Sequence, residues 1–261
     1  MHPPHRDKDL EGALQEALDG GYSVWAVGDI HGYREEFEYL LGILRLVDGD
    51  MVICLGDLID RGPDSHGVLS IVRDSNRIFS IKGNHELLMS EALGEDSHRE
   101  QFWIGRVGGR ATLDSMGTRE SEKREQAKRW LDFTDNLPTE VILDRFRLAH
   151  SGYRADMPLE DQSDEDRLKS REVFRATLPL DPKRQIIAGH TPVQMLPNFD
   201  VESPEEGVWR SQVLMDDGRP SAVLIDTGIV LRNSSHRPRI SAYDLQTGKI
   251  EEILRINQVL T

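Results

Sequence analysis

The fold is decided by three stretches of the same pattern, which read VWAVGDIHG over residues 24–32, MVICLGDLIDRG over residues 51–62 and RIFSIKGNHE over residues 77–86. Each starts with apolar residues and ends in a glycine followed by polar side chains, which is typical of a buried strand and the turn after it. Residues 34–46 and 64–73 lie between them and carry apolar residues at the spacing of an amphipathic helix. Short apolar strands alternating with such helices predict βαβ units, an α/β fold and a largely parallel sheet.

The second half of the chain adds a helical segment and further strands. Residues 94–140 are polar and are predicted to form a helical insert beside the sheet, with 121–136 as its best helix. Strands are expected at 145–149, 185–188 and 222–226, an acidic loop at 156–166, a helix at 167–178, and a terminal hairpin within 238–256 that turns at Thr247-Gly248. No internal repeat or linker divides the chain, so we expect residues 1–261 to form a single domain.

The composition limits the partners and the compartment. The chain has 32 Lys+Arg against 46 Asp+Glu, a net charge of −14, which argues against a broad cationic surface for nucleic acid or acidic membranes. Cys54 is the only cysteine, so an intrachain disulfide is excluded and a reducing compartment is expected. No apolar run reaches the length of about 18 residues that a membrane helix needs, and the polar N-terminal residues show no secretory signal. We therefore expect a cytoplasmic protein without nucleic-acid or membrane partners.

Side chains of metal-ligand type follow the predicted strands. They are Asp29, His31, Asp57, Asn84, His150 and His190. His31 lies 26 residues before Asp57, and Asn84 lies 27 residues after it, each close to one βα repeat. Because strands of an open α/β sheet place their carboxyl ends at a common edge, we expect these side chains to surround one crevice. Carboxylates, imidazoles and an amide oxygen together suit Mn, Fe or Zn.

The charge of this set favours phosphate chemistry. Two carboxylates do not neutralise two divalent ions, so a site with two metals stays cationic and attracts a phosphate dianion. Six protein ligands for two ions require one shared carboxylate, and Asp57 is the natural bridge because its strand is the middle one of the first three. Two metals about 3.5–4 Å apart can share a hydroxide for in-line attack on phosphorus.

These blocks resemble those of a known enzyme family. Residues 28–32, 56–62 and 83–86 are similar to the three signature blocks of the phosphoprotein phosphatase (PPP) branch of the calcineurin-like metallophosphoesterases. Residues 150–152 and 189–192 resemble its two later histidine blocks, in the same order, and the likeness extends over residues 23–245. The resemblance implies two mixed β-sheets in a central sandwich flanked by helices, with two metals at the strand ends.

The resemblance also implies a role for each residue of the metal set. The first metal would be held by Asp29, His31 and Asp57, and the second by Asp57, Asn84, His150 and His190. His85 would be the general acid that protonates the leaving oxygen. Asp60 would hydrogen-bond His85 and keep it protonated, since a neighbouring carboxylate raises the pKa of an imidazole.

The phosphate group would be bound by Asn84 and two arginines. Arg61 is the first of them, because a guanidinium can hold phosphate through two parallel hydrogen bonds. The second is expected in the segment LKSREVF at 168–174, where Arg171 is our candidate. Arg175, one turn later on the same predicted helix, is the alternative.

Two further segments resemble bacterial members of the family. Residues 225–228 read IDTG where the animal-type enzymes have a toxin-binding loop. A bacterial Trp-x-x-x-Gly-Gly-x-x-Thr-Leu motif is matched, with one extra spacing residue, by Trp103, Gly108, Gly109, Thr112 and Leu113. We interpret Trp103 and Trp130 as packing residues rather than a substrate platform, and Asp226 as the end of a strand.

The leading functional hypothesis is a serine/threonine protein phosphatase that uses two divalent metals, with manganese expected first. A symmetrical diadenosine tetraphosphate hydrolase is the alternative, although those enzymes tend to lack an acidic residue at the position of Asp60 and to have Asp at that of Glu86. A third hypothesis is a non-catalytic metal-binding scaffold that contacts a partner through residues 94–140. The physiological substrate, the metal and the oligomeric state stay open.

Overall fold

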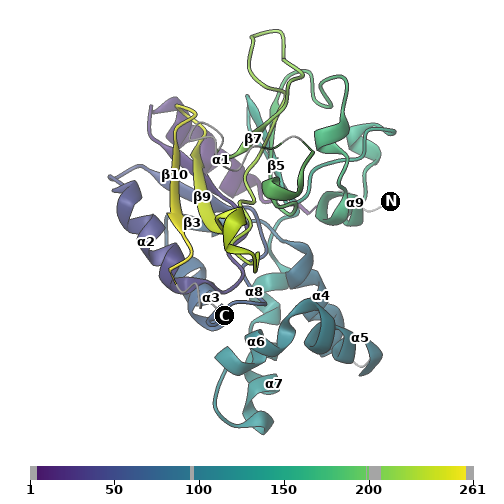
Figure 1. Cartoon of the computed structure of the whole chain (residues 1–261). Helices are drawn as coiled ribbons and strands as arrows, with labels where there is room; N and C mark the ends of the chain where they lie inside the picture. Colours follow the sequence, from purple (N-terminus) through teal and green to yellow (C-terminus); the bar gives the residue numbers. More distant parts are fainter. Residues whose placement is uncertain (1–4, 95–96, 198, 200–206, 257–261) are drawn as a thin grey trace.

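The computed structural model describes residues 5–94, 97–197, 199 and 207–256, so the ends of the predicted single domain, 1–4 and 257–261, lie outside the described residues. Two five-stranded sheets lie at the centre, with helices around them (Figure 1). The helical insert, teal in Figure 1, gathers at one end of the molecule below both sheets. The predicted architecture of two mixed sheets flanked by helices is confirmed.

The first sheet contains the three predicted βαβ strands. Its order is β10-β9-β1-β2-β3, with bounds Val24–Val27 for β1, Met51–Cys54 for β2, Ile78–Ser80 for β3, Arg239–Asp244 for β9 and Ile250–Leu254 for β10. Strands β1, β2 and β3 are parallel, whereas β9 runs antiparallel to β1 and forms the predicted antiparallel hairpin with β10. The crossovers are α2 (Arg34–Leu44) and α3 (Ser65–Arg73). An unpredicted helix, α1 (Lys8–Asp19), precedes β1.

The second sheet is also mixed. Its order is β4-β5-β6-β8-β7, with bounds Glu140–Ile142 for β4, Phe146–Ala149 for β5, Gln185–Ala188 for β6, Trp209–Arg210 for β7 and Ala222–Leu224 for β8. Strands β5, β6 and β8 are parallel, and β4 and β7 are antiparallel edges that we did not predict. The parallel strands of each sheet end on the same side, which places several polar turns together.

The apolar core follows the alternation of side chains along the strands. Ala26 of β1 and Ile53 of β2 belong to the cluster packed between the two sheets. Their neighbours Val27 and Cys54 belong to the cluster that packs on the helices. β1 and β2 are therefore buried on both faces, which explains why these two segments are apolar throughout rather than alternating.

The two sheets are in close contact where β1 and β8 end. Gly28 follows β1, and a Cβ atom at this position would clash with the backbone carbonyl of Ile225. Gly189 follows β6, and a Cβ atom there would clash with the carboxylate of Asp29. Only glycine fits at such contacts, so these two residues allow strand ends from both sheets to form one site.

The insert is helical as predicted, but its best predicted helix is wrong in length. It follows α4 (Asn84–Leu93) and contains α5 (Ser97–Phe102), a π-helical turn η1 (Trp103–Val107), α6 (Gly109–Ser115), α7 (Glu120–Lys128) and α8 (Leu131–Asp135). The single helix expected over 121–136 is broken at Trp130, whose buried ring lies 4.2 Å from the guanidinium carbon of Arg73 and packs edge-on against His66. This contact with α3 competes with helix continuation.

The segment before β6 also differs from the prediction. The expected acidic loop at 156–166 already contains the start of α9 (Asp164–Lys169), which Ser163 caps by accepting from the backbone N–H of Asp166. The helix expected at 167–178 ends at Lys169, because Ser170 adopts an extended conformation. A short 3₁₀ turn, Val173–Arg175, is all that follows. Arg171 therefore lies outside any helix.

No helix in the described part of the chain has the length and apolar character needed to cross a bilayer.

Candidate metal centre

The six predicted ligands lie together at the ends of five strands and helices. Asp29 and His31 follow β1, Asp57 follows β2, and Asn84 begins α4. His150 follows β5 and His190 follows β6, so the second sheet contributes two imidazoles to a site that begins on the first sheet.

Asp57 lies at the centre of this arrangement, and its two carboxylate oxygens face different groups. Oδ2 lies 3.6 Å from Nε2 of His31, which is itself 3.8 Å from Oδ2 of Asp29. Oδ1 lies 3.4 Å from Nε2 of His150. That nitrogen is also 2.9 Å from Oδ1 of Asn84 and 3.1 Å from Nδ1 of His190. This two-sided position is the one a carboxylate shared by two ions requires.

Backbone carbonyls orient two of the imidazoles. Nδ1 of His31 lies 2.8 Å from the carbonyl oxygen of Ile59, and Nδ1 of His150 lies 2.7 Å from that of Leu55. A carbonyl only accepts, so each Nδ1 carries the proton and each Nε2 presents a lone pair to the site. Ligating histidines are commonly held in this way.

The site is suited to a cation. Burial lowers the pKa of His31 and His150, and burial with the neighbouring His150 lowers that of His190 to about 2. The imidazoles are therefore neutral, and the lone pair on Nε2 of His150 faces two oxygen acceptors, Oδ1 of Asn84 at 2.9 Å and Oδ1 of Asp57 at 3.4 Å. Burial also raises the pKa of Asp29 well above its usual value, so its charged form lacks a counter-charge. Divalent metals bound by these nitrogen and oxygen donors would supply it.

The backbone around the ligands is strained. His31, Asp57 and His190 have φ angles of 48°, 49° and 66°, in the left-handed region that side chains other than glycine rarely adopt. Such strain persists only where the surrounding structure enforces it, and it is common at functional sites.

Glu86 supports the turn that carries Asp57. Its carboxylate, fully buried, accepts from the backbone N–H groups of Asp57 (3.0 Å), Leu58 (2.9 Å) and Gly83 (2.8 Å). Burial raises the pKa of Glu86 to about 7. Glu86 thereby ties the end of β2 to the start of α4, a role that its sequence position did not reveal.

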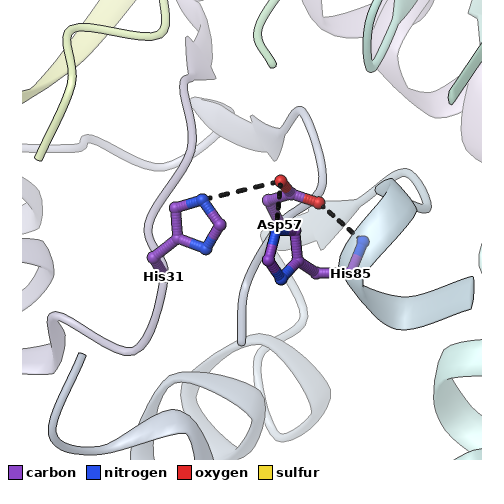
Figure 2. Close-up of side chains that lie close together, drawn as sticks. All are labelled: His31, Asp57 and His85. Carbon is purple, nitrogen blue, oxygen red and sulfur yellow. Dashed lines mark hydrogen bonds and ion pairs between the residues drawn. The ribbon is translucent and has the colours of Figure 1, made fainter. Parts of the chain in front are cut away.

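His85 and Asp60 form a buried pair beside the metal ligands. Nδ1 of His85 lies 2.6 Å from Oδ2 of Asp60. Burial alone would lower the pKa of His85, but the carboxylates of Asp57 and Asp60 raise it above the usual value. Figure 2 shows the rings of His31 and His85 beside the same carboxylate, and Nε2 of His85 is 3.8 Å from Oδ2 of Asp57, the oxygen that also faces His31. These three side chains can themselves converge on one ion.

Two guanidinium groups border the ligands. Arg61 NH1 donates to Nε2 of His31 at 3.1 Å. Arg171 NH1 donates to the hydroxyl of Thr191, next to His190, at 3.0 Å. The guanidinium of Arg175 instead lies over the ring of Phe174, 5.2 Å from its centre. The structure thus brings Arg171, rather than Arg175, to the neighbourhood of the ligands.

Asp226 belongs to the same region, although we interpreted it only as the end of a strand. It directly follows Ile225 after β8, is buried, and accepts from the N–H of Gly228 at 2.9 Å. Burial raises the pKa of Asp226 to about 7, and its charge contributes to the raised pKa of Asp29. The available signal was its place after a predicted strand, which it shares with the other site residues.

Comparison with known proteins gives a consistent assignment. The chain matches the profile of the family described as calcineurin-like phosphoesterase over residues 22–226. It is 29% identical to serine/threonine-protein phosphatase 1 of Salmonella typhimurium over 67% of this chain and 82% of that protein. It is 37% identical to a symmetrical bis(5'-nucleosyl)-tetraphosphatase of Nitrosospira multiformis over 30% of each.

Solved structures show the same fold at low sequence identity. A structure described as a putative diadenosine tetraphosphatase covers 90% of this chain and 95% of its own, with a TM-score of 0.56 and 21% identity. A serine/threonine phosphatase of Saccharomyces cerevisiae covers 96% of this chain and 90% of its own, with a TM-score of 0.55 and 14% identity. The chain belongs to the calcineurin-like phosphoesterase family.

Proposed function

We propose that the protein is a phosphomonoester hydrolase that removes phosphate from phosphoserine and phosphothreonine in proteins. The observation that carries the proposal is the position of Asp57 between two groups of neutral imidazoles, beside the buried His85–Asp60 pair. The intact set Asp29, His31, Asp57, Asn84, His150 and His190 supports a pair of divalent ions, with manganese as the metal we propose. The single cysteine supports a cytoplasmic location as part of this proposal.

Two divalent ions, when bound, would neutralise phosphate charge and activate a water molecule for attack on phosphorus. The chain itself binds and orients the substrate. Arg61 and Arg171 offer planar donors to the phosphate oxygens that do not react, and such donors suit phosphate geometry. The amide of Asn84, beside His150, adds a neutral contact to the same group.

His85 supplies the proton for the leaving oxygen. As the bond between phosphorus and the serine oxygen breaks, Nε2 of His85 transfers its proton to that oxygen, while the attacking water becomes part of the phosphate. The raised pKa of His85 keeps this proton available near neutral pH. Asp60 balances the positive charge of the imidazolium before the transfer.

The direct test is hydrolysis of a set of phosphoserine and phosphothreonine peptides by metal-stripped protein reloaded with manganese. We expect turnover above that of manganese alone, and loss of at least about a hundredfold in Asp57→Asn, because both metal groups share this residue. His66→Asn is the matched control, since His66 is exposed on the α3 surface and should leave turnover unchanged. Absence of turnover, or full turnover in Asp57→Asn, would contradict the proposal.

A symmetrical diadenosine tetraphosphate hydrolase is the second candidate function. It is favoured by the relatives and by the solved structure described with that activity. The leaving group of a phosphoanhydride is a stable anion and needs little protonation, whereas a serine alkoxide needs an acid. The short His85–Asp60 contact therefore favours the phosphoester substrate. Hydrolysis of diadenosine tetraphosphate in the same manganese buffer distinguishes the two.

A further inference from the structure

The bacterial-type motif of the insert, Trp103 to Leu113, contacts Asp60, which its sequence alone does not indicate. Trp103 is fully buried, as expected of a packing residue. Its indole N–H nevertheless points at Asp60, with Nε1 2.9 Å from Oδ2 and 3.2 Å from Oδ1. Thr112, also fully buried, donates its hydroxyl to Oδ1 of Asp60 at 2.6 Å and accepts from the backbone N–H of Asp60 at 2.9 Å.

The two glycines of the motif allow this approach. Gly108 has a φ of 115°, and a Cβ atom there would lie 2.7 Å from Cγ of Arg61. Its carbonyl accepts from the backbone N–H of Arg61 at 3.2 Å. A Cβ atom on Gly109 would clash with the ring of Trp103. The motif is thus shaped to fit against the turn that carries Asp60 and Arg61.

That turn needs external support. Asp60 and Arg61 have φ angles of 72° and 71°, two consecutive left-handed residues that are not glycine. The N–H of Asp60 is bound by Thr112 and by the hydroxyl of Ser65 at 3.1 Å. The insert therefore contributes to a backbone conformation that would otherwise be unfavourable.

The hydrogen bonds on Asp60 also determine the ring orientation of His85. An indole N–H can only donate, so Asp60 accepts from Trp103 at both oxygens and from Thr112 at Oδ1. The remaining lone pair of Oδ2 faces Nδ1 of His85 at 2.6 Å. An accepting oxygen there requires a proton on Nδ1, which leaves Nε2 as the ring nitrogen that faces the site.

We propose that Trp103 and Thr112 are positioning residues for the acid: they hold the Asp60 carboxylate so that His85 presents Nε2 to the leaving oxygen. The helical insert is then part of the proton-donating apparatus, and not only a cover on the sheet. This inference rests on the proposed function in one respect, the assignment of His85 as general acid.

The test uses Trp103→Phe, which keeps an aromatic ring without the indole N–H, and Thr112→Val, which keeps the branched shape without the hydroxyl, with Thr112→Ser as the conservative variant. Trp130→Phe is the matched control, because Trp130 is a buried tryptophan of the same insert that packs against Arg73 and His66. Each protein, reloaded with manganese, is assayed with a phosphoserine peptide and with p-nitrophenyl phosphate, whose leaving group needs no acid. His85→Asn is measured alongside as the reference.

We expect kcat for the phosphoserine peptide to fall about five- to tenfold in Trp103→Phe and in Thr112→Val, because each variant removes one of the donors that hold the Asp60 carboxylate. We expect kcat for the aryl ester to fall less than about twofold, and Thr112→Ser to recover the peptide rate. Equal losses on both esters, or losses no larger than in Trp130→Phe, would overturn the inference. Should Trp103→Phe fail to fold, Thr112→Val and Thr112→Ser carry the test.

A measurement that does not depend on activity separates the positioning role of Trp103 and Thr112 from the assignment of His85 as the acid. In the zinc-loaded protein, ring-nitrogen NMR of ¹⁵N-labelled histidine, assigned with His85→Asn, should show the proton of His85 on Nδ1. We expect a changed ring-nitrogen spectrum for His85 in Thr112→Val and Trp103→Phe and an unchanged one in Trp130→Phe. If His85→Asn lowers kcat for the peptide and for the aryl ester by the same factor, the assignment of His85 as the acid is wrong. If His85→Asn lowers the peptide rate selectively, but the Trp103 and Thr112 variants change neither the His85 spectrum nor the ratio of the two rates, the positioning role is wrong.

Discussion

Loading the site with manganese is expected to stabilise the fold in two parts, because the ligands form two groups that share Asp57. One group lies on its Oδ2 side with His31, and the other on its Oδ1 side with His150 and His190. Without ions the folded protein holds acceptor atoms of His150, Asn84 and Asp57 against one another, together with the buried carboxylate of Asp29. Ions that bind only the folded state remove this cost, so stability should rise with metal concentration.

The size of the effect follows from the number of sites and the length of the chain. An ion present at about a hundred times its dissociation constant stabilises the folded state by about 2.7 kcal/mol per site. A chain of 261 residues unfolds with an entropy of about 0.55 kcal/mol per degree near its midpoint. Each ion should therefore raise Tm by about 5 °C, and both together by about 10 °C.

The assay is differential scanning calorimetry of stripped and reloaded protein. We expect the full shift in wild type and in the control His66→Asn, about half of it in His31→Asn and in His190→Asn, and almost none in Asp57→Asn. A full shift in Asp57→Asn would refute the shared carboxylate. Loss of the whole shift in both single-histidine variants would refute the division into two groups.

Three other predictions concern single side chains. Arg61→Lys should raise KM for phosphopeptides and the inhibition constant of inorganic phosphate by about tenfold or more, because an ammonium group lacks the planar pair of donors of a guanidinium. Steady-state kinetics with phosphate as the inhibitor measures both constants. Glu140→Gln should lower the unfolding free energy by about 3–5 kcal/mol in urea titrations, since it removes the carboxylate 3.4 Å from the buried guanidinium of Arg167; a loss under about 1 kcal/mol would contradict this. Burial alone would raise the pKa of Glu11, but the hydrogen bond from Arg6 lowers it below 4.5, so the stabilisation by Glu11 is complete above pH 4.5 and is lost as the pH falls through the folded-state pKa. Glu11→Gln should therefore destabilise the protein at pH 7, and progressively less as the pH falls below 4.5, in urea titrations at a series of pH values.

The strand ends were predictable because their signals are local. A buried strand, a glycine and a polar side chain follow one another within a few residues, so Asp29, Asp57 and Asn84 could be placed without knowledge of distant contacts. The topology then brings such ends together at one edge. His150 and His190 belong to the other sheet, yet the same pattern located them.

The helix boundaries and the route by which Arg171 reaches the site depend on contacts between residues that are distant in sequence. The break at Trp130 is caused by packing on α3, and helix periodicity contains no information about that neighbour. Arg167 was expected to begin a helix, but its buried side chain binds the carbonyl of Gln162 at 2.7 Å and Glu140, and the helix ends soon after it. Arg171 consequently reaches the site from an irregular segment. Tertiary contacts of this kind override local propensity.

Trp103 illustrates the same limit within the site. Its apolar character and spacing predicted burial correctly. The partner of its N–H lies 43 residues earlier in the chain, on the turn after β2, and no local pattern relates the two. A motif can thus indicate that a tryptophan is required without indicating which group it contacts.

A substrate competition is the decisive test of whether the site hydrolyses phosphoserine esters with His85 as the acid. Manganese-reloaded protein is given equimolar phosphoserine peptide and diadenosine tetraphosphate, and both products are followed in one reaction. We expect a higher kcat/KM for the peptide, with the preference reduced at least about tenfold in His85→Asn. A higher kcat/KM for the dinucleotide, unchanged in preference by His85→Asn, would contradict it.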